Sequence, residues 1–300
     1  MPVRIGVDLG GTKIECVALD HSGREIFRRR VDTPPGDYAA TVEAIVRLVA
    51  EAERELGERG TVGVATPGSL SRATGRMKNS NSLCLNDQPL LQDLEQRLAR
   101  PVRIANDANC FALSEAVDGA ATGARNVFGI ILGTGVGGGI VFDRKVVDGP
   151  NGIAGEWGHN ALPRIGPDDW PQPVCYCGRA GCVETYLSGP GMAGDHQRRT
   201  RVSLTARQIA EQAATGDAAC RATLERYCDR LARALGAVIN ILDPDVIVAG
   251  GGVSNIDALY REVPQRWSAY VFSDDVRTRF ARNRHGDSSG VRGAAWLWND

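Results

Sequence analysis

Short runs of alternating hydrophobic and polar residues occupy the first part of the chain. They predict strands at Val3–Val7, Ile14–Leu19 and Glu25–Val31. Turn residues separate these runs, at Gly10-Gly11 and at His21-Ser22-Gly23. The chain is therefore expected to open with a small antiparallel meander.

A helical period replaces the alternation after Asp37, which can cap a helix. Apolar residues recur every three or four positions from Val42 to Leu56, and Gly57 fits as the stop. The pattern then predicts a strand at Val62–Ala65, a helix near Leu90–Leu98 and a strand at Val102–Ala105.

The second half repeats the opening arrangement. A predicted strand at Val127–Leu132 leads through a glycine loop into a second strand at Gly139–Phe142. A long amphipathic helix runs from about Asp217 to Leu242, followed by a strand at Val246–Ala249. A strand–glycine loop–strand unit thus occurs twice, which predicts two related α/β lobes around a ligand-binding cleft.

Composition narrows the class of protein. The 300 residues are 43% hydrophobic and 24% charged, as in ordinary globular chains, and a net charge of −1 gives no basic field for nucleic acid. The longest apolar run, near Leu235–Leu242, is too short to cross a membrane. We expect no signal peptide, no disulfide scaffold among the eight cysteines, and a cytoplasmic location.

One histidine and three cysteines form a complete ligand set for a tetrahedral Zn²⁺: His159, Cys175, Cys177 and Cys182. No position is left open for water, so such a zinc would be structural. It would hold Glu156 and Glu184, which flank the set, in fixed positions. The alternative is that these are ordinary cytosolic cysteines, because Cys-x-Cys-x₄-Cys is not a standard zinc-finger spacing.

Glycine-rich loops that follow strands can cradle phosphate oxygens with backbone N–H groups. Candidate nucleotide-binding residues are Asp8, Gly10, Gly11, Thr12 and Lys13, then Gly133, Thr134, Gly135 and Gly137, then Gly250, Gly251 and Gly252. Asp8 could orient Mg²⁺ through water. Tight hairpins are the alternative reading of these loops.

One glycine pattern matches the dinucleotide-binding fingerprint but lacks the helix that must follow it. Gly133, Gly135 and Gly138 match G-x-G-x-x-G, but a Rossmann loop must open a helix. The alternating run after it, 139–142, predicts a strand instead. We therefore reject a dinucleotide-dependent dehydrogenase.

A carboxylate follows the predicted strand Val102–Ala105 in the run Asn106-Asp107-Ala108-Asn109. At a helix N-terminus the Asp107 side chain would stay ionised and could accept a proton from an attacking sugar hydroxyl. Helix capping is its alternative role.

Together these motifs resemble the ROK family of sugar kinases, repressors and related proteins. The resemblance rests on Asp8–Lys13, Asn106–Asn109, Gly133–Gly138, Gly155–His159, Cys175–Glu184 and Ala249–Gly252, which span nearly the whole chain in the order of the family. It implies a two-lobed actin-like ATPase (ribonuclease H-like) fold with an inter-lobe cleft. The expected lobes are 1–106, with a C-terminal helix at about 288–300 packing back on it, and 107–287 with the zinc module.

The resemblance also implies roles for individual residues. Asp107 would be the catalytic base, and the sugar-binding residues would be Gly68, Asn81, Asn106, Asp107, Glu156, His159 and Glu184. His159 would bind zinc through one ring nitrogen and address the sugar with the other. The implied reactants are ATP with Mg²⁺ and a hexose, in a monomer or homodimer.

Within the family the runs Lys78–Ser82, Gly155–Asn160, Cys175–Gly178 and Arg284–Trp296 look most like bacterial fructokinase/mannokinase. We therefore expect a hexose kinase acting on the 6-hydroxyl of fructose, with mannose as a further candidate substrate. N-acetylglucosamine kinase and glucokinase are the alternatives. A sugar-responsive repressor is disfavoured because the chain starts directly on its phosphate-loop strand.

Overall fold

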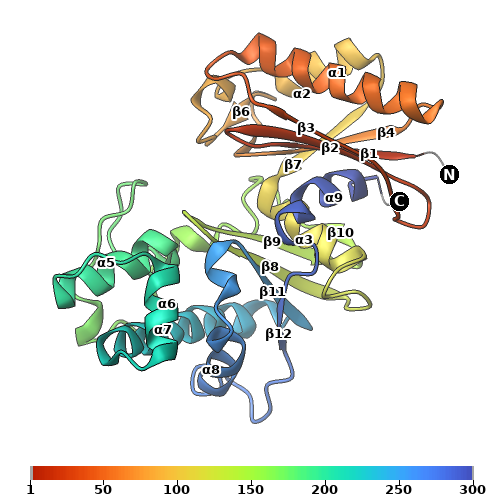
Figure 1. The fold of residues 1–300 in the computed structure, drawn as a ribbon. Coiled ribbons are helices and arrows are strands. Elements are labelled where there is room, and N and C mark those ends of the chain that lie inside the picture. The colour runs from red at the N-terminus through yellow and green to blue at the C-terminus, as the bar shows by residue number, and fades with distance from the viewer. Residues whose placement is uncertain (1–2, 299–300) are drawn as a thin grey trace. The chain divides into compact units, whose positions relative to one another are not determined.

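The computed structural model describes residues 3–298 and divides the chain into two compact units (Figure 1). The first unit contains residues 1–125, 139–154 and 284–300, and the second contains 126–138 and 155–283. Within the described residues, no helix combines the length and the apolar character that crossing a membrane requires. The predicted lobe boundary between residues 106 and 107 stays a prediction.

A five-stranded sheet forms the centre of the first unit, in the order β3-β2-β1-β4-β7. Its strands are β1 (Arg4–Leu9), β2 (Lys13–Leu19), β3 (Glu25–Asp32), β4 (Thr61–Thr66) and β7 (Val102–Asn106). The first three pair antiparallel, whereas β1, β4 and β7 run parallel. All five strands were predicted from the hydrophobic pattern, and the structure confirms them to within one or two residues at each end.

Helices cover both faces of this sheet, as Figure 1 shows. On one face lie α1 (Tyr38–Leu56) and α2 (Leu90–Leu98). Asp37 caps α1 by accepting a hydrogen bond from the Ala40 N–H, and Gly57 ends the helix in the left-handed conformation, as predicted. The buried aliphatic side chains of α1 and the sheet form the core.

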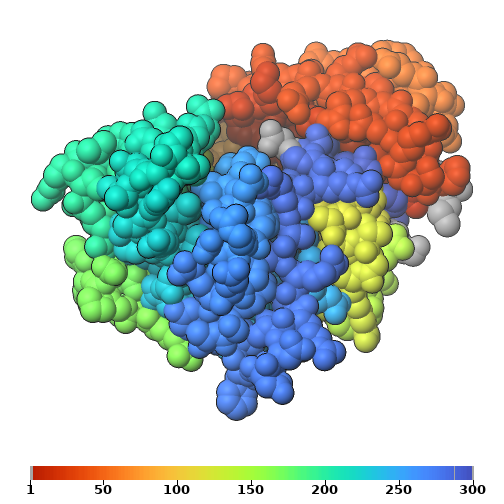
Figure 2. Space-filling view, turned by 60° about the horizontal axis from the view of Figure 1, so that its bottom comes forward, coloured from red at the N-terminus to blue at the C-terminus, as the bar shows by residue number. Residues whose placement is uncertain are grey.

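The other face carries the C-terminal helix α9 (Ser289–Trp296), which packs on β1, β4 and α3 (Asp107–Val117). In Figure 2 dark-blue C-terminal residues adjoin red N-terminal ones. The approach is so close that a Cβ atom at Gly63 of β4 would overlap the carbonyl oxygen of Ala294. The predicted helix extends to residue 300, but positions 299 and 300 lie outside the described residues.

Other short elements of the first unit belong to neither five-stranded sheet. They are β5 (Ser69–Leu70), β6 (Met77–Lys78), η1 (Leu83–Leu85) and η5 (Gly286–Ser288). The sheet pair β5-β6 follows β4 directly and carries the loop with Asn81. A hydrogen-bond pair between the Asn86 side chain and the Ser80 backbone holds that loop in place.

A second five-stranded sheet has the order β10-β9-β8-β11-β12. Its strands are β8 (Asn126–Leu132), β9 (Val136–Phe142), β10 (Lys145–Val146), β11 (Val246–Gly250) and β12 (Arg279–Arg282). Strand β9 confirms the prediction that a strand, and not a helix, follows the glycine loop. Because β8 and β11 are parallel neighbours, the loops after them leave from the same edge of the sheet.

The second unit also contains most of the helices. They are η2 (Trp157–His159), η3 (Pro167–Asp169), α4 (Val183–Leu187), α5 (Gly189–Thr200), α6 (Ala206–Thr215), α7 (Ala218–Leu242), η4 (Gly252–Asn255) and α8 (Ala258–Trp267). The long helix α7 packs against α5, α6 and α8. It matches the predicted helix from Asp217, which caps it by accepting a hydrogen bond from the Cys220 N–H.

Candidate functional site

Carboxylates of the first unit gather where β1 and β7 end. Asp8 lies near the end of β1, and Asn106 ends β7 and caps α3 by accepting a hydrogen bond from the Ala108 N–H. Asp107 is the first residue of α3 and is exposed. Asn106 therefore fills the helix-capping role that was the alternative for Asp107. The Asp107 carboxylate also accepts a hydrogen bond of 2.8 Å from the Ala108 N–H.

The two carboxylates of Asp8 and Asp107 act on each other. Burial, followed by the negative charges of Asp107 and Glu15, raises the pKa of Asp8 from 3.8 to about 7, against the lowering effect of Arg30. The charge of Asp107 thus opposes ionisation of Asp8, and a cation bound beside them would relieve that opposition.

The structure brings first-unit residues predicted to bind sugar close together. The Asn106 amide donates a hydrogen bond of 3.1 Å to the Gly68 carbonyl, so these two residues are adjacent. Gly68 in turn packs against the backbone of Ser80, the neighbour of the exposed Asn81. Lys13, predicted to contact phosphate, forms an exposed ion pair of 3.4 Å with Asp32, a kind of pair that is easily given up.

The glycine loops of the second unit do lie together. Gly133–Gly137 follows β8 and Gly250–Gly252 follows β11, at neighbouring positions on one sheet edge. The first loop is closed by a hydrogen bond of 3.0 Å from Gly133 N–H to the Gly135 carbonyl. Loops at the carboxyl edge of parallel strands are where open α/β sheets bind ligands.

Glu184 connects the first of these loops to the cysteine-rich segment. Its Oε2 accepts a hydrogen bond of 2.9 Å from the Val136 N–H. A Cβ atom at Gly135 would come within 2.7 Å of the same oxygen, so a larger residue at 135 would force the carboxylate to shift. Glu184 is in the first turn of α4, directly after Cys182.

The predicted ligand set is assembled: His159, Cys175, Cys177 and Cys182 each place one ligand atom within 4.8 Å of the others. His159 Nδ1 lies 3.7 Å from Cys175 Sγ, and Cys177 Sγ lies 3.6 Å from Cys182 Sγ. Tetrahedral zinc–sulfur bonds of ~2.3 Å imply sulfur–sulfur separations of about 3.8 Å, so the cluster fits Zn²⁺.

The local environment gives the thiols of this cluster different pKa values. A hydrogen bond from the Arg179 N–H lowers the pKa of the exposed Cys177, whereas burial raises the pKa of Cys182 to about 12. Glu156 is exposed directly before η2, which carries His159. The two carboxylates and the imidazole predicted to bind sugar in this unit therefore lie on elements joined to the cluster.

Tyr176 is a site residue that the sequence analysis missed. Its hydroxyl lies 2.9 Å from His159 Nε2, and the two rings meet edge-to-face at 5.2 Å. Although the side chain is largely exposed, partial desolvation of the phenol and the nearby charge of Glu184 raise its pKa. Its place between Cys175 and Cys177 was a signal, since both neighbours are ligands of the predicted cluster.

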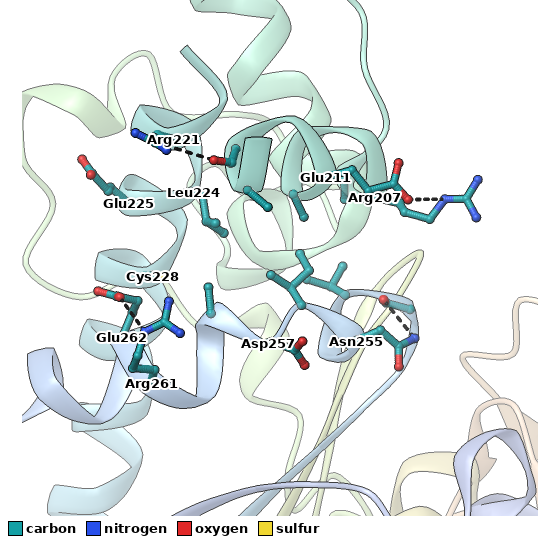
Figure 3. A pocket seen from close by; sticks show the side chains of 18 of the residues that line it. Arg207, Glu211, Arg221, Leu224, Glu225, Cys228, Asn255, Asp257, Arg261 and Glu262 are labelled. Carbon is teal, nitrogen blue, oxygen red and sulfur yellow. Dashed lines mark hydrogen bonds and ion pairs between the residues drawn. The ribbon is translucent and has the colours of Figure 1, made fainter. Parts of the chain in front are cut away.

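A cavity of about 780 Å³ lies between α6, α7, α8 and η4 (Figure 3). Alanines, Leu224 and Ile256 line its inner wall, and charged residues such as Arg207, Glu211 and Arg261 stand around it. Gly252 belongs to the lining, so the cavity adjoins the second glycine loop. The sequence analysis did not predict this cavity, because its wall combines segments that are distant along the chain.

Comparisons of this chain with known proteins all indicate the same family. The ROK family model matches residues 4–300. N-acetyl-D-glucosamine kinases of Salmonella gallinarum and of Escherichia coli O1:K1 are both 43% identical to this chain. The first aligns over 296 residues and the second over 297, in each case 97% of this chain and 98% of the relative.

Solved structures agree with this match. A ROK hexokinase from Thermus thermophilus superposes with a TM-score of 0.87 at 30% identity, over 98% of this chain and 97% of that one. A ROK family glucokinase from Streptomyces griseus, solved with glucose and AMPPNP, gives a TM-score of 0.75 at 29% identity, over 98% of each chain. The chain has the predicted actin-like ATPase fold, and it belongs to the ROK family.

Proposed function

We propose that this protein transfers the γ-phosphoryl group of ATP to a hydroxyl of N-acetylglucosamine. The observation that carries the proposal is the 43% identity to N-acetyl-D-glucosamine kinases over 97% of the chain. The coarser assignment, a sugar kinase of the ROK family, does not depend on which sugar is the substrate. The preference for fructose expected from the sequence gives way to its alternative, because the relatives with this identity carry the N-acetylglucosamine name.

Asp107 is the proposed catalytic base. It is exposed at the N-terminus of α3, where the helix dipole favours an ionised carboxylate that can accept the proton of a sugar hydroxyl. Asn106 beside it, with Gly68 and Asn81, would bind other hydroxyls. From the second unit Glu156, His159 and Glu184 would contribute the remaining sugar contacts.

The glycine loops and the cavity next to them are the proposed nucleotide site. Backbone N–H groups of Gly133–Gly137 and Gly250–Gly252 would face phosphate oxygens. The cavity beside Gly252 has a volume in the range of small-ligand sites, and its apolar wall suits a flat heterocyclic base. Mg²⁺ bound with ATP would neutralise phosphate charge, and the negative field of Asp8 and Asp107 would favour it.

The four-residue cluster is the proposed site of a structural Zn²⁺, held by His159, Cys175, Cys177 and Cys182. When bound, the metal would supply rigidity to the segment that carries the sugar-binding carboxylates. It would take no part in phosphoryl transfer, because four protein ligands complete a tetrahedral site. The chain itself would position the sugar through Glu156 and Glu184.

A coupled assay for ADP release tests this function directly. The protein is incubated with ATP, Mg²⁺ and one of N-acetylglucosamine, glucose, mannose or fructose, and kcat/KM is compared. We expect N-acetylglucosamine to give the highest value. A higher value for glucose would favour glucokinase instead, and no turnover of any of the four sugars would contradict the kinase proposal.

A further inference from the structure

The one ring nitrogen of His159 that faces away from the cysteine cluster is already occupied. Nδ1 lies 3.7 Å from Cys175 Sγ, and Nε2 lies 2.9 Å from the Tyr176 hydroxyl. If the proposed sugar site is right, Nε2 is the nitrogen that would meet the sugar. Tyr176 therefore stands where a sugar hydroxyl is expected.

The surroundings of the phenol agree with that position. Glu184, another sugar-binding candidate, has its Oε1 4.0 Å from the sulfur of Cys175, the residue directly before Tyr176. Glu156, the third candidate of the second unit, directly precedes η2, whose last residue is His159. The segments that carry these candidates are thus joined to the turn that carries Tyr176.

An imidazole whose Nδ1 belongs to a ligand set presents a single N–H, at Nε2. One N–H makes one good hydrogen bond, so it can serve the tyrosine or the sugar, but not both at once. We propose that Tyr176 competes with the sugar for His159 and must swing away before the sugar binds. This inference rests on the function proposed above.

The side chain is free to make this movement, whereas its backbone is not. Tyr176 is 83% exposed and its ring packs only against His159 among the described ring contacts. The backbone on either side forms a turn, closed by a hydrogen bond of 2.9 Å from Gly178 N–H to the Cys175 carbonyl. Rotation about the side-chain bonds can therefore release His159 while the cysteines keep their places.

Removal of the hydroxyl tests the competition. Tyr176→Phe cannot hold Nε2, so sugar no longer displaces a hydrogen bond within the protein. We expect its Kd for N-acetylglucosamine, measured by titration calorimetry, to fall about fivefold, which is the usual net worth of one such bond. In Tyr176→Phe the KM for the sugar should fall by a similar factor, while kcat stays close to that of the unaltered protein. Tyr176→Ala should also bind the sugar more tightly than the unaltered protein does.

Tyr270→Phe is the matched control, because it removes a tyrosine hydroxyl that bonds Asp229 at 2.6 Å outside this site. It should leave the sugar Kd unchanged, and zinc content should be equal in all variants. If Tyr176→Phe binds the sugar as the unaltered protein does, there is no competition. Weaker binding would make Tyr176 a direct sugar ligand and would equally overturn the proposal.

Failure of the two proposals can be told apart. An unaltered protein that neither binds nor phosphorylates any of the four sugars contradicts the proposed function, and the competition with it. A protein that phosphorylates a sugar, but whose affinity does not rise in Tyr176→Phe, contradicts only the competition.

Discussion

Glu184 Oε2 accepts a hydrogen bond of 2.9 Å from the backbone N–H of Val136. This contact joins α4, which begins after the cluster residue Cys182, to the glycine loop that follows β8. One carboxylate thus belongs to the proposed sugar site and also shapes the proposed phosphate loop. Changes at Glu184 are expected to affect both substrates.

Glu184→Ala leaves the Val136 N–H without its partner and removes a proposed sugar contact. We expect the KM for sugar and the KM for ATP to rise together, each by about tenfold, because losing a hydrogen-bond partner of a charged group costs 1–3 kcal/mol. Glu184→Gln keeps an oxygen that can accept the loop bond, so its KM for ATP should stay close to normal. A rise in the sugar KM alone for Glu184→Ala would show that the loop does not depend on this bond.

Asp107→Asn removes the proposed proton acceptor with little change of shape. The expected result is a kcat lower by about 10² or more, with sugar and ATP still bound. The control is Asp143→Asn, an exposed aspartate paired with Arg125, which should keep a normal kcat. A near-normal kcat in Asp107→Asn would mean that Asp107 is not the base and serves only as a residue of the first turn of α3.

Zinc should be found at one ion per chain in protein purified without chelator. Cys182→Ser should lower that content and the melting temperature, and weaken sugar binding, since the cluster holds the segment with Glu184. Cys84→Ser changes a cysteine that lies outside the cluster and should keep full zinc. Absence of zinc by elemental analysis, or a disulfide between two of the cluster cysteines, contradicts this prediction.

A larger side chain on the wall of the cavity beside Gly252 would fill part of its volume. Ala210→Phe should raise the KM for ATP by about tenfold and leave the sugar Kd unchanged, because the added ring takes the space of the base. Ala219→Phe places the same ring on an exposed position of α7 outside the lining and should have no effect. An unchanged KM for ATP in Ala210→Phe would place the base elsewhere.

Asp8 should make stability depend on pH. Its pKa in the folded protein, about 7, is raised above the value of 3.8 for a free side chain. The stability it contributes is present below about pH 4 and is lost as pH rises toward 7, because ionisation is harder in the folded state. The free energy of unfolding of the unaltered protein, relative to Asp8→Asn, should therefore be smaller at pH 8 than at pH 4.5.

Urea denaturation of both proteins at the two pH values measures this difference. The comparison with Asp8→Asn removes the contribution of all other titrating groups, since both chains share them. A difference that does not change with pH would mean that Asp8 has an ordinary pKa in the folded protein.

Local patterns were enough to predict most of the sheets. The mostly apolar run Ile14–Leu19 is buried throughout, and the helical period after Asp37 places one face of α1 against the core, so the sequence pattern and the fold agree. The cluster of His159 and the three cysteines was predictable for a similar reason. Ligand residue types that lie within one short segment can meet without help from distant parts of the chain.

Features built from distant segments could not be predicted in this way. The cavity wall requires α6, α7 and α8 to pack together, and no short stretch records that packing. The pairing of Lys13 with Asp32 depends on the register between β2 and β3. The contact of Tyr176 with His159 depends on side-chain direction, which the spacing of residues along the chain does not specify.

Helix α9 fills a place in the first unit between β4 and α3, yet it is made from the end of the chain. During synthesis the N-terminal sheet is made long before residues 289–296, so the face that α9 covers stays open until that helix has been made. The uncovered apolar face is the part of the nascent first unit that chaperones would need to protect.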